Sequence, residues 1–312
     1  MNKEKVPKIL LMGKGGVGKT SMRSIIFANC APRDTFVLGY TNEVAEIRMR
    51  FMGNMMLNLY DYGGQNEFIK QYLDSKREQI FSCVEILVFV IEAERSKHNS
   101  NNEDLTYFED CIKALSEFSK QAKVFVLVNK MDLVADHRKQ IVFEKRIKEL
   151  KDRSNDFDVK CYPTSIWEVS LYKAWTDIVS TLIMDIDALK KGLANFASAC
   201  NADEVILFEK STFLLTCYHS TKNNTMSDDQ RFEKISHIIK KFKLSCINNK
   251  SQFQSLIIKT KNFTTYLEEF TKSTYIMITL QDKNVNINLL KLSIDLAKGK
   301  MEEIIFNSDE NK

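Results

Sequence analysis

An eight-residue segment near the start of the chain has the composition and spacing of a phosphate-binding loop. Residues 13–20 read Gly-Lys-Gly-Gly-Val-Gly-Lys-Thr and match the pattern G-x-x-x-x-G-K-[ST] at every fixed position. A short apolar strand is predicted before the loop, over Lys8–Met12, and a helix after it, from Lys19 to about Asn29. In that context successive backbone N–H groups can surround a phosphate, and the helix dipole favours its negative charge.

The side chains of this loop indicate a nucleoside triphosphate and a magnesium ion. Lys19 can reach the β- and γ-phosphate oxygens, which also makes it a catalytic candidate, and the Thr20 hydroxyl can coordinate Mg²⁺. We expect the whole loop and the residue after it to contact the nucleotide: Lys14, Gly15, Gly16, Val17, Gly18, Lys19, Thr20 and Ser21.

A second motif, Asp61-Tyr62-Gly63-Gly64-Gln65, begins where another apolar strand ends. The carboxylate of Asp61 can hold Mg²⁺, directly or through water. Gly64 can donate its N–H group to a γ-phosphate, and Gln65 can orient an attacking water molecule. About 40 residues after a phosphate loop, this motif indicates nucleotide hydrolysis with Gln65 as the catalytic residue.

The segment between the first helix and this strand, Arg33–Glu46, shows no strong secondary-structure signal. A loop that brings a threonine hydroxyl to Mg²⁺ beside the γ-phosphate, and releases it after hydrolysis, is the element a nucleotide switch needs. Thr41 is the predicted magnesium ligand, whereas Thr35 is expected nearer the base or ribose. The alternative is an ordinary solvated loop whose threonines have no such role.

Base selectivity is predicted from two further strand ends. The Asp132 carboxylate can accept two hydrogen bonds from the N1–H and exocyclic amine of guanine, a pair of donors that adenine lacks. Lys130 would pack its stem over the base, and Asn129 would link this loop to the phosphate loop. Ser165 and Ile166 can offer backbone N–H groups to the guanine oxygen. Together the motifs indicate that the chain binds GTP and GDP with Mg²⁺.

The order of predicted elements indicates two domains. Up to residue 184 strands alternate with helices, and strands such as Glu85–Ile91 are apolar on both faces, as in a mostly parallel, doubly wound α/β sheet. From residue 185 the order is α-β-β-α-β-β-α, which favours an α+β domain with a small antiparallel sheet. We therefore expect a nucleotide-binding domain over 1–184 and a second domain over 185–312.

Composition excludes several other classes of protein. The 45 basic and 41 acidic residues leave a net charge of +4, so a nucleic-acid-coating protein is not expected. The seven cysteines lie far apart, without the two-residue gap of a zinc knuckle or redox dithiol. No apolar run is long enough for a membrane span, and the ends carry neither a signal peptide nor a common lipid anchor. We expect a cytoplasmic protein without direct membrane insertion.

Three further groups of side chains are expected to serve packing or solvation and not chemistry. Cys217 and His219 share one face of a predicted strand, and core packing or partner contact is favoured over metal ligation because further ligands are missing nearby. Lys240–Lys243 is expected on the solvated face of an amphipathic helix. Trp167 and Trp175 are expected to pack the last helix of the first domain.

The chain resembles the Rag GTPases, and specifically their RagA/RagB-type subunits. The residues that carry the resemblance are spread over both domains: 19–29, 51–54, 61–65, 130–134, 164–167, 171–175, 202–205, 231–236 and 242–246. Two positions depart from the family pattern, which usually has histidine where Asn129 stands and serine at Gly15.

This resemblance implies a P-loop small-GTPase domain followed by a roadblock-type domain that pairs with a RagC/RagD-type subunit. Members act at the cytosolic face of the lysosome or vacuole, where a scaffold complex tethers them. With GTP bound, the heterodimer recruits the TOR kinase complex when amino acids are plentiful. GTPase-activating proteins and exchange factors are the other partners that the resemblance implies.

Two alternatives remain open at this point. The loop also resembles the deviant phosphate loop of dimeric ATPases, in which Lys14 would reach a partner's nucleotide; Asp132 and Gln65 favour the GTPase. The second alternative is a scaffold protein that holds GTP and barely hydrolyses it. It stays open because small GTPases hydrolyse GTP slowly unless an activating protein supplies an arginine.

Overall fold

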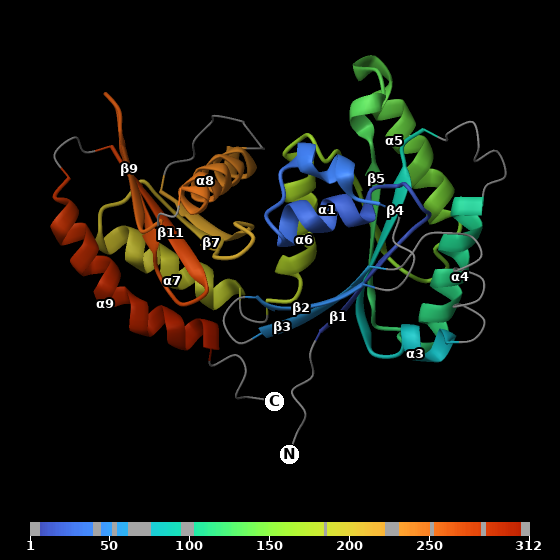
Figure 1. Ribbon diagram of the computed structural model, residues 1–312. Helices are drawn as coiled ribbons and strands as arrows, with labels where there is room; N and C mark the ends of the chain where they lie inside the picture. Colours follow the sequence, from blue (N-terminus) through green and yellow to red (C-terminus); the bar gives the residue numbers. More distant parts are fainter. Residues whose placement is uncertain are drawn as a thin grey trace. The chain divides into compact units, whose positions relative to one another are not determined.

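The computed structural model describes residues 7–39, 45–51, 55–61, 76–94, 103–183, 186–221, 231–249, 253–281 and 285–306. They form two compact units (Figure 1). The first unit comprises Met1–Met49 and Met56–Ala174, and the second comprises Arg50–Met55 and Trp175–Lys312, so one division between them falls inside helix α6 (Ser170–Ser180).

A six-stranded sheet forms the centre of the first unit, in the order β2-β3-β1-β4-β5-β6. Strand β1 pairs in parallel with β3 on one side and β4 on the other, and β4–β5 and β5–β6 are also parallel. The strands are β1 (Lys8–Met12), β2 (Ala45–Phe51), β3 (Met55–Asp61), β4 (Val84–Glu92), β5 (Lys123–Asn129) and β6 (Val159–Pro163). The predicted doubly wound sheet is confirmed, with β1 at the point where the chain changes direction across the sheet.

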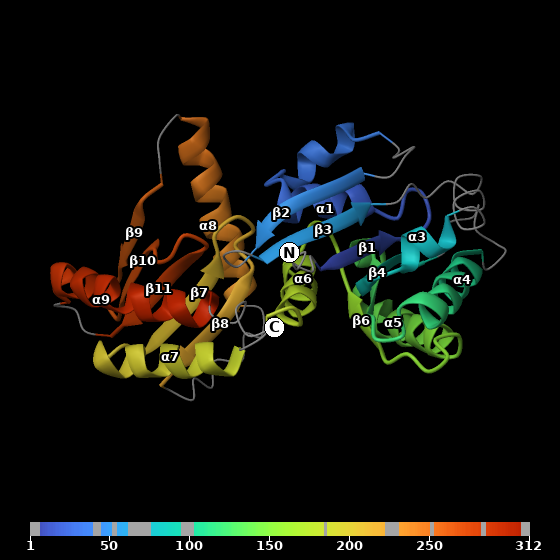
Figure 2. The same ribbon diagram turned by 90° about the horizontal axis from the view of Figure 1, so that it is seen from below.

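Helices cover both faces of this sheet (Figures 1 and 2). On one face lie α1 (Lys19–Phe27) and α6, and on the other α3 (Arg77–Phe81), α4 (Glu103–Phe118) and α5 (Asp136–Lys151). The loops contain two 3₁₀ helices, η1 (Pro32–Val37) and η2 (Met131–Leu133). The sequence did not indicate α3 or η1, because each is a turn or two long and lacks an amphipathic pattern.

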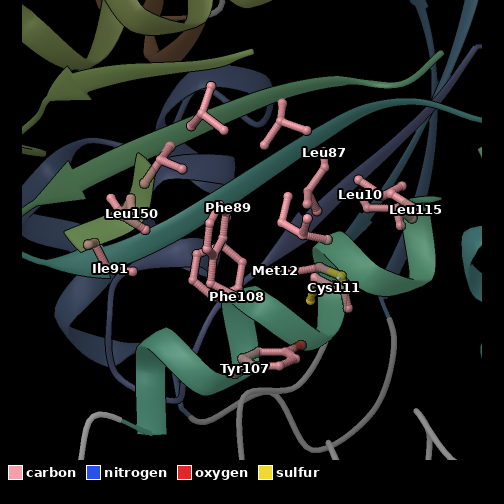
Figure 3. Close-up of a cluster of buried hydrophobic side chains, with 14 of the residues drawn as sticks. Leu10, Met12, Leu87, Phe89, Ile91, Tyr107, Phe108, Cys111, Leu115 and Leu150 are labelled. Carbon is pink, nitrogen blue, oxygen red and sulfur yellow. Dashed lines mark hydrogen bonds between the residues drawn. The ribbon is translucent and has the colours of Figure 1, made fainter. Parts of the chain in front are cut away.

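An aromatic and aliphatic cluster between the sheet and α4 fixes the layers of the first unit (Figure 3). The Phe89 ring lies edge-on to Phe108 and Tyr107, with centroids 5.2 and 5.4 Å apart. Cys111 packs against Met12, with 3.9 Å between their sulfur atoms. Because β1 and β4 are held between two helical layers, the loops at their carboxyl ends start from fixed positions.

The second unit contains a five-stranded antiparallel sheet in the order β8-β7-β11-β10-β9, with β8 and β9 at its edges. Its elements are α7 (Ile186–Ala199), β7 (Glu204–Glu209), β8 (Leu215–Ser220), α8 (Arg231–Asn248), β9 (Ser255–Lys259), β10 (Thr264–Glu269), β11 (Thr274–Leu280) and α9 (Ile287–Phe306). Helices α7 and α9 lie on one face and α8 on the other (Figures 1 and 2).

The predicted order of the second domain missed one strand. Strand β10 reads Thr-Thr-Tyr-Leu-Glu-Glu, and its two glutamates weaken the apolar pattern that marks a strand. Hydrogen-bonded neighbours on both sides, β9 and β11, supply the stability that its own side chains do not indicate. The α+β class is nevertheless correct.

The expectation that Lys240–Lys243 forms a solvated face was wrong for two of its lysines. Lys240 is buried, and its ammonium lies 3.5 Å from the Thr212 carbonyl oxygen. The Lys243 ammonium donates to the Lys210 carbonyl at 3.0 Å and lies 4.9 Å above the Phe213 ring. Helix α8 therefore uses lysine stems to cover the β7–β8 turn, a contact that helical periodicity alone does not reveal.

Candidate functional site

The loop between β1 and α1 has a backbone that only glycine tolerates at two positions. Gly13 and Gly18 have φ angles of +139° and +97°. A Cβ atom at Gly13 would lie 2.2 Å from the Val90 carbonyl oxygen, and one at Gly18 would lie 2.6 Å from Asn129 Nδ2. The glycines thus let the loop turn tightly against β4 and against the end of β5.

Lys19 is held at the centre of this loop. Its ammonium donates to the Gly13 and Lys14 carbonyl oxygens at 2.7 and 2.9 Å. Burial lowers the pKa of Lys19 to about 8, while the negative charge of Asp61 acts in the opposite direction. A polyphosphate beside this ammonium would favour its charged form, so the loop is electrostatically suited to an anion.

Thr20 and Asp61 come together at the ends of β1 and β3. The Thr20 hydroxyl donates to Asp61 Oδ2 at 2.9 Å, and Arg23 Nε donates to the same oxygen at 3.1 Å. Asp61 is fully buried, and its other oxygen, Oδ1, has no hydrogen-bond donor among the described residues. A hydroxyl beside a buried, under-satisfied carboxylate is an all-oxygen donor set that fits Mg²⁺.

The loop after β5, which begins at Asn129 and contains Asp132, is called the base loop, and it is tied to the phosphate loop as the sequence predicts. Asn129 is buried; its Nδ2 donates to the Val17 carbonyl at 2.8 Å, and its Oδ1 accepts from the Thr164 hydroxyl at 3.2 Å. Lys130 follows in a left-handed conformation with φ of +64°, and its ammonium pairs with Glu92 at the end of β4. One amide at the end of β5 therefore joins the phosphate loop to the loop that follows β6, which begins at Thr164.

The two halves of the predicted base site also meet. Asp132 lies in η2 with its carboxylate exposed, and the Met131 N–H donates to the Thr164 carbonyl at 3.1 Å. The Ser165 N–H donates to the Ser170 hydroxyl at 3.2 Å, so this group already has an acceptor. Of the two N–H groups predicted for the guanine oxygen, that of Ile166 is the better candidate.

Of the residues predicted to respond to the γ-phosphate or to lie in the switch segment, Thr35 is among the described residues. Thr35 is buried in η1, where its hydroxyl donates to the Pro32 carbonyl at 2.7 Å. Thr41, Gly64 and Gln65 lie outside the described residues. Trp175 is buried in α6 as predicted, but the expectation for Trp167 was wrong, because Trp167 is exposed and contacts Phe36 instead.

Other candidate features carry no metal site. Cys217 is buried in β8 and His219 lies two residues further on, and the described part of the chain contains no cluster of three metal-binding side chains. No helix in the described ranges is long and apolar enough to cross a membrane.

Comparison with known proteins identifies the family. A model of the Gtr1/RagA G protein conserved region matches residues 8–239. Ras-related GTP-binding protein A of Dictyostelium discoideum is 43% identical over 97% of this chain and 99% of its own. The chain belongs to the Gtr1/RagA family of Rag GTPases. The GTP-binding protein gtr1 of Schizosaccharomyces pombe is 41% identical over 95% of both chains, and Ras-related GTP-binding protein C of Mus musculus is 25% identical over 89% of this chain and 71% of its own.

As a Rag-family protein, the chain is a small GTPase that binds guanine nucleotide and hydrolyses GTP. The geometry of Lys14 argues against the ATPase alternative. Its side chain is buried and pairs with Glu103 at the start of α4 in the same chain, so it does not project towards a second copy. The resemblance inferred from the motifs is confirmed, including its assignment to the RagA/RagB type.

Proposed function

We propose that this GTPase is one subunit of a Rag heterodimer that signals amino-acid sufficiency to the TOR kinase complex at the lysosome or vacuole. The observation that carries the proposal is similarity to RagA-type proteins over nearly the full length of both chains. The second unit is included in that similarity, so the likeness extends beyond the nucleotide-binding fold. Recruitment to the membrane would use a scaffold complex.

The nucleotide site supports this proposal at each position that is described. Backbone N–H groups of residues 14–21 would hold the phosphates, and Lys19 would neutralise the β- and γ-phosphate charge. Asp132 and the Ile166 N–H would select guanine, with Lys130 over the base. Ser165 and Thr35 would shape the surrounding loops through the hydrogen bonds given above.

Thr20, Asp61 and Thr41 would hold Mg²⁺, which neutralises developing negative charge on the phosphates when it is bound. Gln65 would orient the attacking water, and the Gly64 N–H would contact the γ-phosphate. An activating protein would accelerate hydrolysis and an exchange factor would replace GDP with GTP. The GTP- and GDP-bound forms would then differ in the segment that contains Thr41.

The second domain, residues 185–312, would form the dimer contact with a RagC/RagD-type subunit. We place the domain boundary after residue 184, between α6, which ends at Ser180, and α7, which begins at Ile186. Strand β9 lies at an edge of its sheet with Ile257 and Ile258 each 44% exposed. An edge strand with exposed isoleucines is suited to pairing with another chain.

The proposal is tested by capturing partners in two nucleotide states. The Gln65→Leu variant should favour the GTP-bound form and recover the TOR complex together with a RagC/RagD-type subunit. The Thr20→Asn variant should weaken magnesium and GTP binding, and recover the subunit without the TOR complex. Equal recovery of the TOR complex by both variants, or no Rag-type subunit with either, would contradict the proposal.

A further inference from the structure

Two exposed aromatic rings from distant parts of the sequence contact each other in the first unit. The ring centroids of Phe36 and Trp167 lie 5.7 Å apart, with 37° between their planes. Phe36 is 77% and Trp167 46% exposed. Each ring covers part of the other, in a position where both would otherwise face water.

Trp167 lies in the loop between β6 and α6, where its backbone is held by hydrogen bonds. Its backbone N–H donates to the Ser165 hydroxyl at 3.1 Å, and the Glu168 N–H donates to the Ser165 carbonyl at 3.2 Å. The Ser165 N–H in turn donates to Ser170 at the start of α6. The backbone of Trp167 is therefore fixed next to Ser165 and Ile166, the residues expected to contact guanine.

Phe36 belongs to the predicted switch segment, Arg33–Glu46. It lies in η1 next to Thr35, whose hydroxyl donates to the Pro32 carbonyl and whose carbonyl accepts from the Leu38 N–H at 3.1 Å. These two hydrogen bonds hold the residues of η1 together. A displacement of Phe36 would therefore displace the rest of η1 as well. The chain reaches the predicted magnesium ligand Thr41 five residues later.

We propose that Phe36 and Trp167 form an aromatic clasp that joins the switch segment to the loop after β6 and slows release of the guanine nucleotide. Release requires the base to leave the loop that ends at Trp167, and the clasp holds a second chain segment against that loop. Both are positioning residues, and the proposal rests on the nucleotide site of the proposed function. A contact between two aromatic rings predicts a release rate about 2- to 10-fold slower than without it.

The test measures dissociation of a fluorescent GDP analogue from the full chain, with magnesium and an excess of unlabelled GDP. Phe36→Ala and Trp167→Ala should each release the analogue about 2- to 10-fold faster. The double variant should be no faster than the faster single variant, because both remove the same contact. Val37→Ala is the matched control: Val37 is the next residue of η1, is 86% exposed, and should leave the rate unchanged.

A second readout follows the contact itself. In a Trp175→Phe background Trp167 is the only tryptophan, since the chain has two. Phe36→Ala should shift its emission to longer wavelength, while Phe36→Tyr, which keeps a ring, should restore both the emission and slow release. Unchanged release in both single variants, or multiplication of their effects in the double variant, would overturn the clasp.

The two proposals fail in different ways. If the wild-type chain did not bind the GDP analogue, the nucleotide site itself would be wrong. If it bound the analogue and all variants released it at the wild-type rate, only the clasp would be refuted. If the variants lost a protein partner while release stayed unchanged, Phe36 and Trp167 would be a docking surface, which also overturns the clasp.

Discussion

Single carboxylates and amides set the chemistry of this protein. Asp61 is buried beside Thr20 and Arg23, and none of the described residues donates to its Oδ1, whereas Asp132 is exposed. Their environments match their different proposed tasks. The buried carboxylate would hold a cation near the phosphates, and the exposed one would be accessible to an incoming base.

Asp132 is predicted to provide the guanine selectivity. Asp132→Asn replaces an acceptor pair with one acceptor and one donor, so the guanine N1–H and amine can no longer both be satisfied. GTP affinity should fall by about 100-fold or more, as expected when buried polar groups lose their partners. Equilibrium titration with a fluorescent GTP analogue measures this loss.

Asp136→Asn is the control for Asp132→Asn, because it removes the same charge from an exposed site four residues away, where Asp136 pairs with Lys139. It should bind GTP like the wild type. If the Asp132→Asn variant bound GTP with the affinity of the wild type, the role assigned to Asp132 would be refuted.

The buried Lys240 is expected to make the free energy of unfolding depend on pH. Burial, and secondarily the charge of Lys243, lower its pKa to about 7, against the opposing effect of Glu209. The unfolded chain keeps this proton up to its ordinary pKa near 10.5, so above pH 7 the unfolded state binds more protons. The Lys240 contribution to the free energy of unfolding therefore rises with pH, by up to about 1.4 kcal/mol per pH unit.

The Lys240→Met variant isolates this contribution. Urea unfolding is followed between pH 7 and pH 8.5 by pulsed hydrogen exchange in peptides from β7 and α8. The difference in unfolding free energy between wild type and variant should grow with pH in favour of the wild type. A difference that stays constant would mean that Lys240 keeps its proton in the folded chain. Lys241→Met, an exposed neighbour on α8, should leave the pH dependence unchanged.

At the scale of elements, the site is an assembly of strand ends. The strands β1, β4, β5 and β6 are parallel neighbours, so their carboxyl ends lie at one edge of the sheet, and Asn129 at the end of β5 bonds to the loops after β1 and β6. We therefore expect the hydrogen bonds of Asn129 to affect both the fold of these loops and the retention of nucleotide.

Asn129→Ala should destabilise the first domain by about 1–3 kcal/mol, because it leaves the Val17 carbonyl and the Thr164 hydroxyl without a partner at a buried position. The release rate of GDP should also increase. Thermal unfolding and GDP dissociation measure the two effects. Gln140→Ala removes only an exposed hydrogen bond to Glu144 and should change neither; normal stability of the Asn129→Ala variant would contradict this account.

The sequence predicts elements best where pattern and chemistry coincide. The phosphate loop and the base loop follow fixed motifs, so the link from Asn129 to the phosphate loop could be predicted, and the structure shows it as a hydrogen bond to the Val17 carbonyl. Strand β10 was not predicted, because pairing with β9 and β11 stabilises it although its two glutamates weaken the apolar pattern of a strand. The Phe36–Trp167 contact and the burial of Lys240 depend on tertiary packing, which local periodicity does not report.

At the scale of the whole molecule, two units of different architecture are joined in one chain. The first contains a mostly parallel sheet with the nucleotide motifs, and the second contains an antiparallel sheet with β9 at one edge. Our proposal assigns nucleotide chemistry to the first unit and partner choice to the second, so changes in one can be tested against the function of the other.

Partner capture should depend on the second domain. Residues 1–184 alone should bind GTP but fail to capture a RagC/RagD-type subunit that the full chain captures. In the full chain, Ile258→Asp places a charge on the exposed edge strand β9 and should weaken capture at least tenfold. Ile141→Asp, on exposed α5 of the first unit, is the control and should capture normally. Undiminished capture by residues 1–184 would contradict the division of roles.

The central claim, a guanine-specific hydrolytic switch, is tested most directly by single-turnover hydrolysis. The full chain is mixed with limiting GTP or ATP and Mg²⁺, beside Gln65→Leu and the exposed control Gln140→Leu. We predict slow cleavage of GTP by the wild type and the control, loss of cleavage in Gln65→Leu, and no cleavage of ATP. Cleavage of ATP, or GTP that stays bound but uncleaved even when an activating protein is added, would contradict the account.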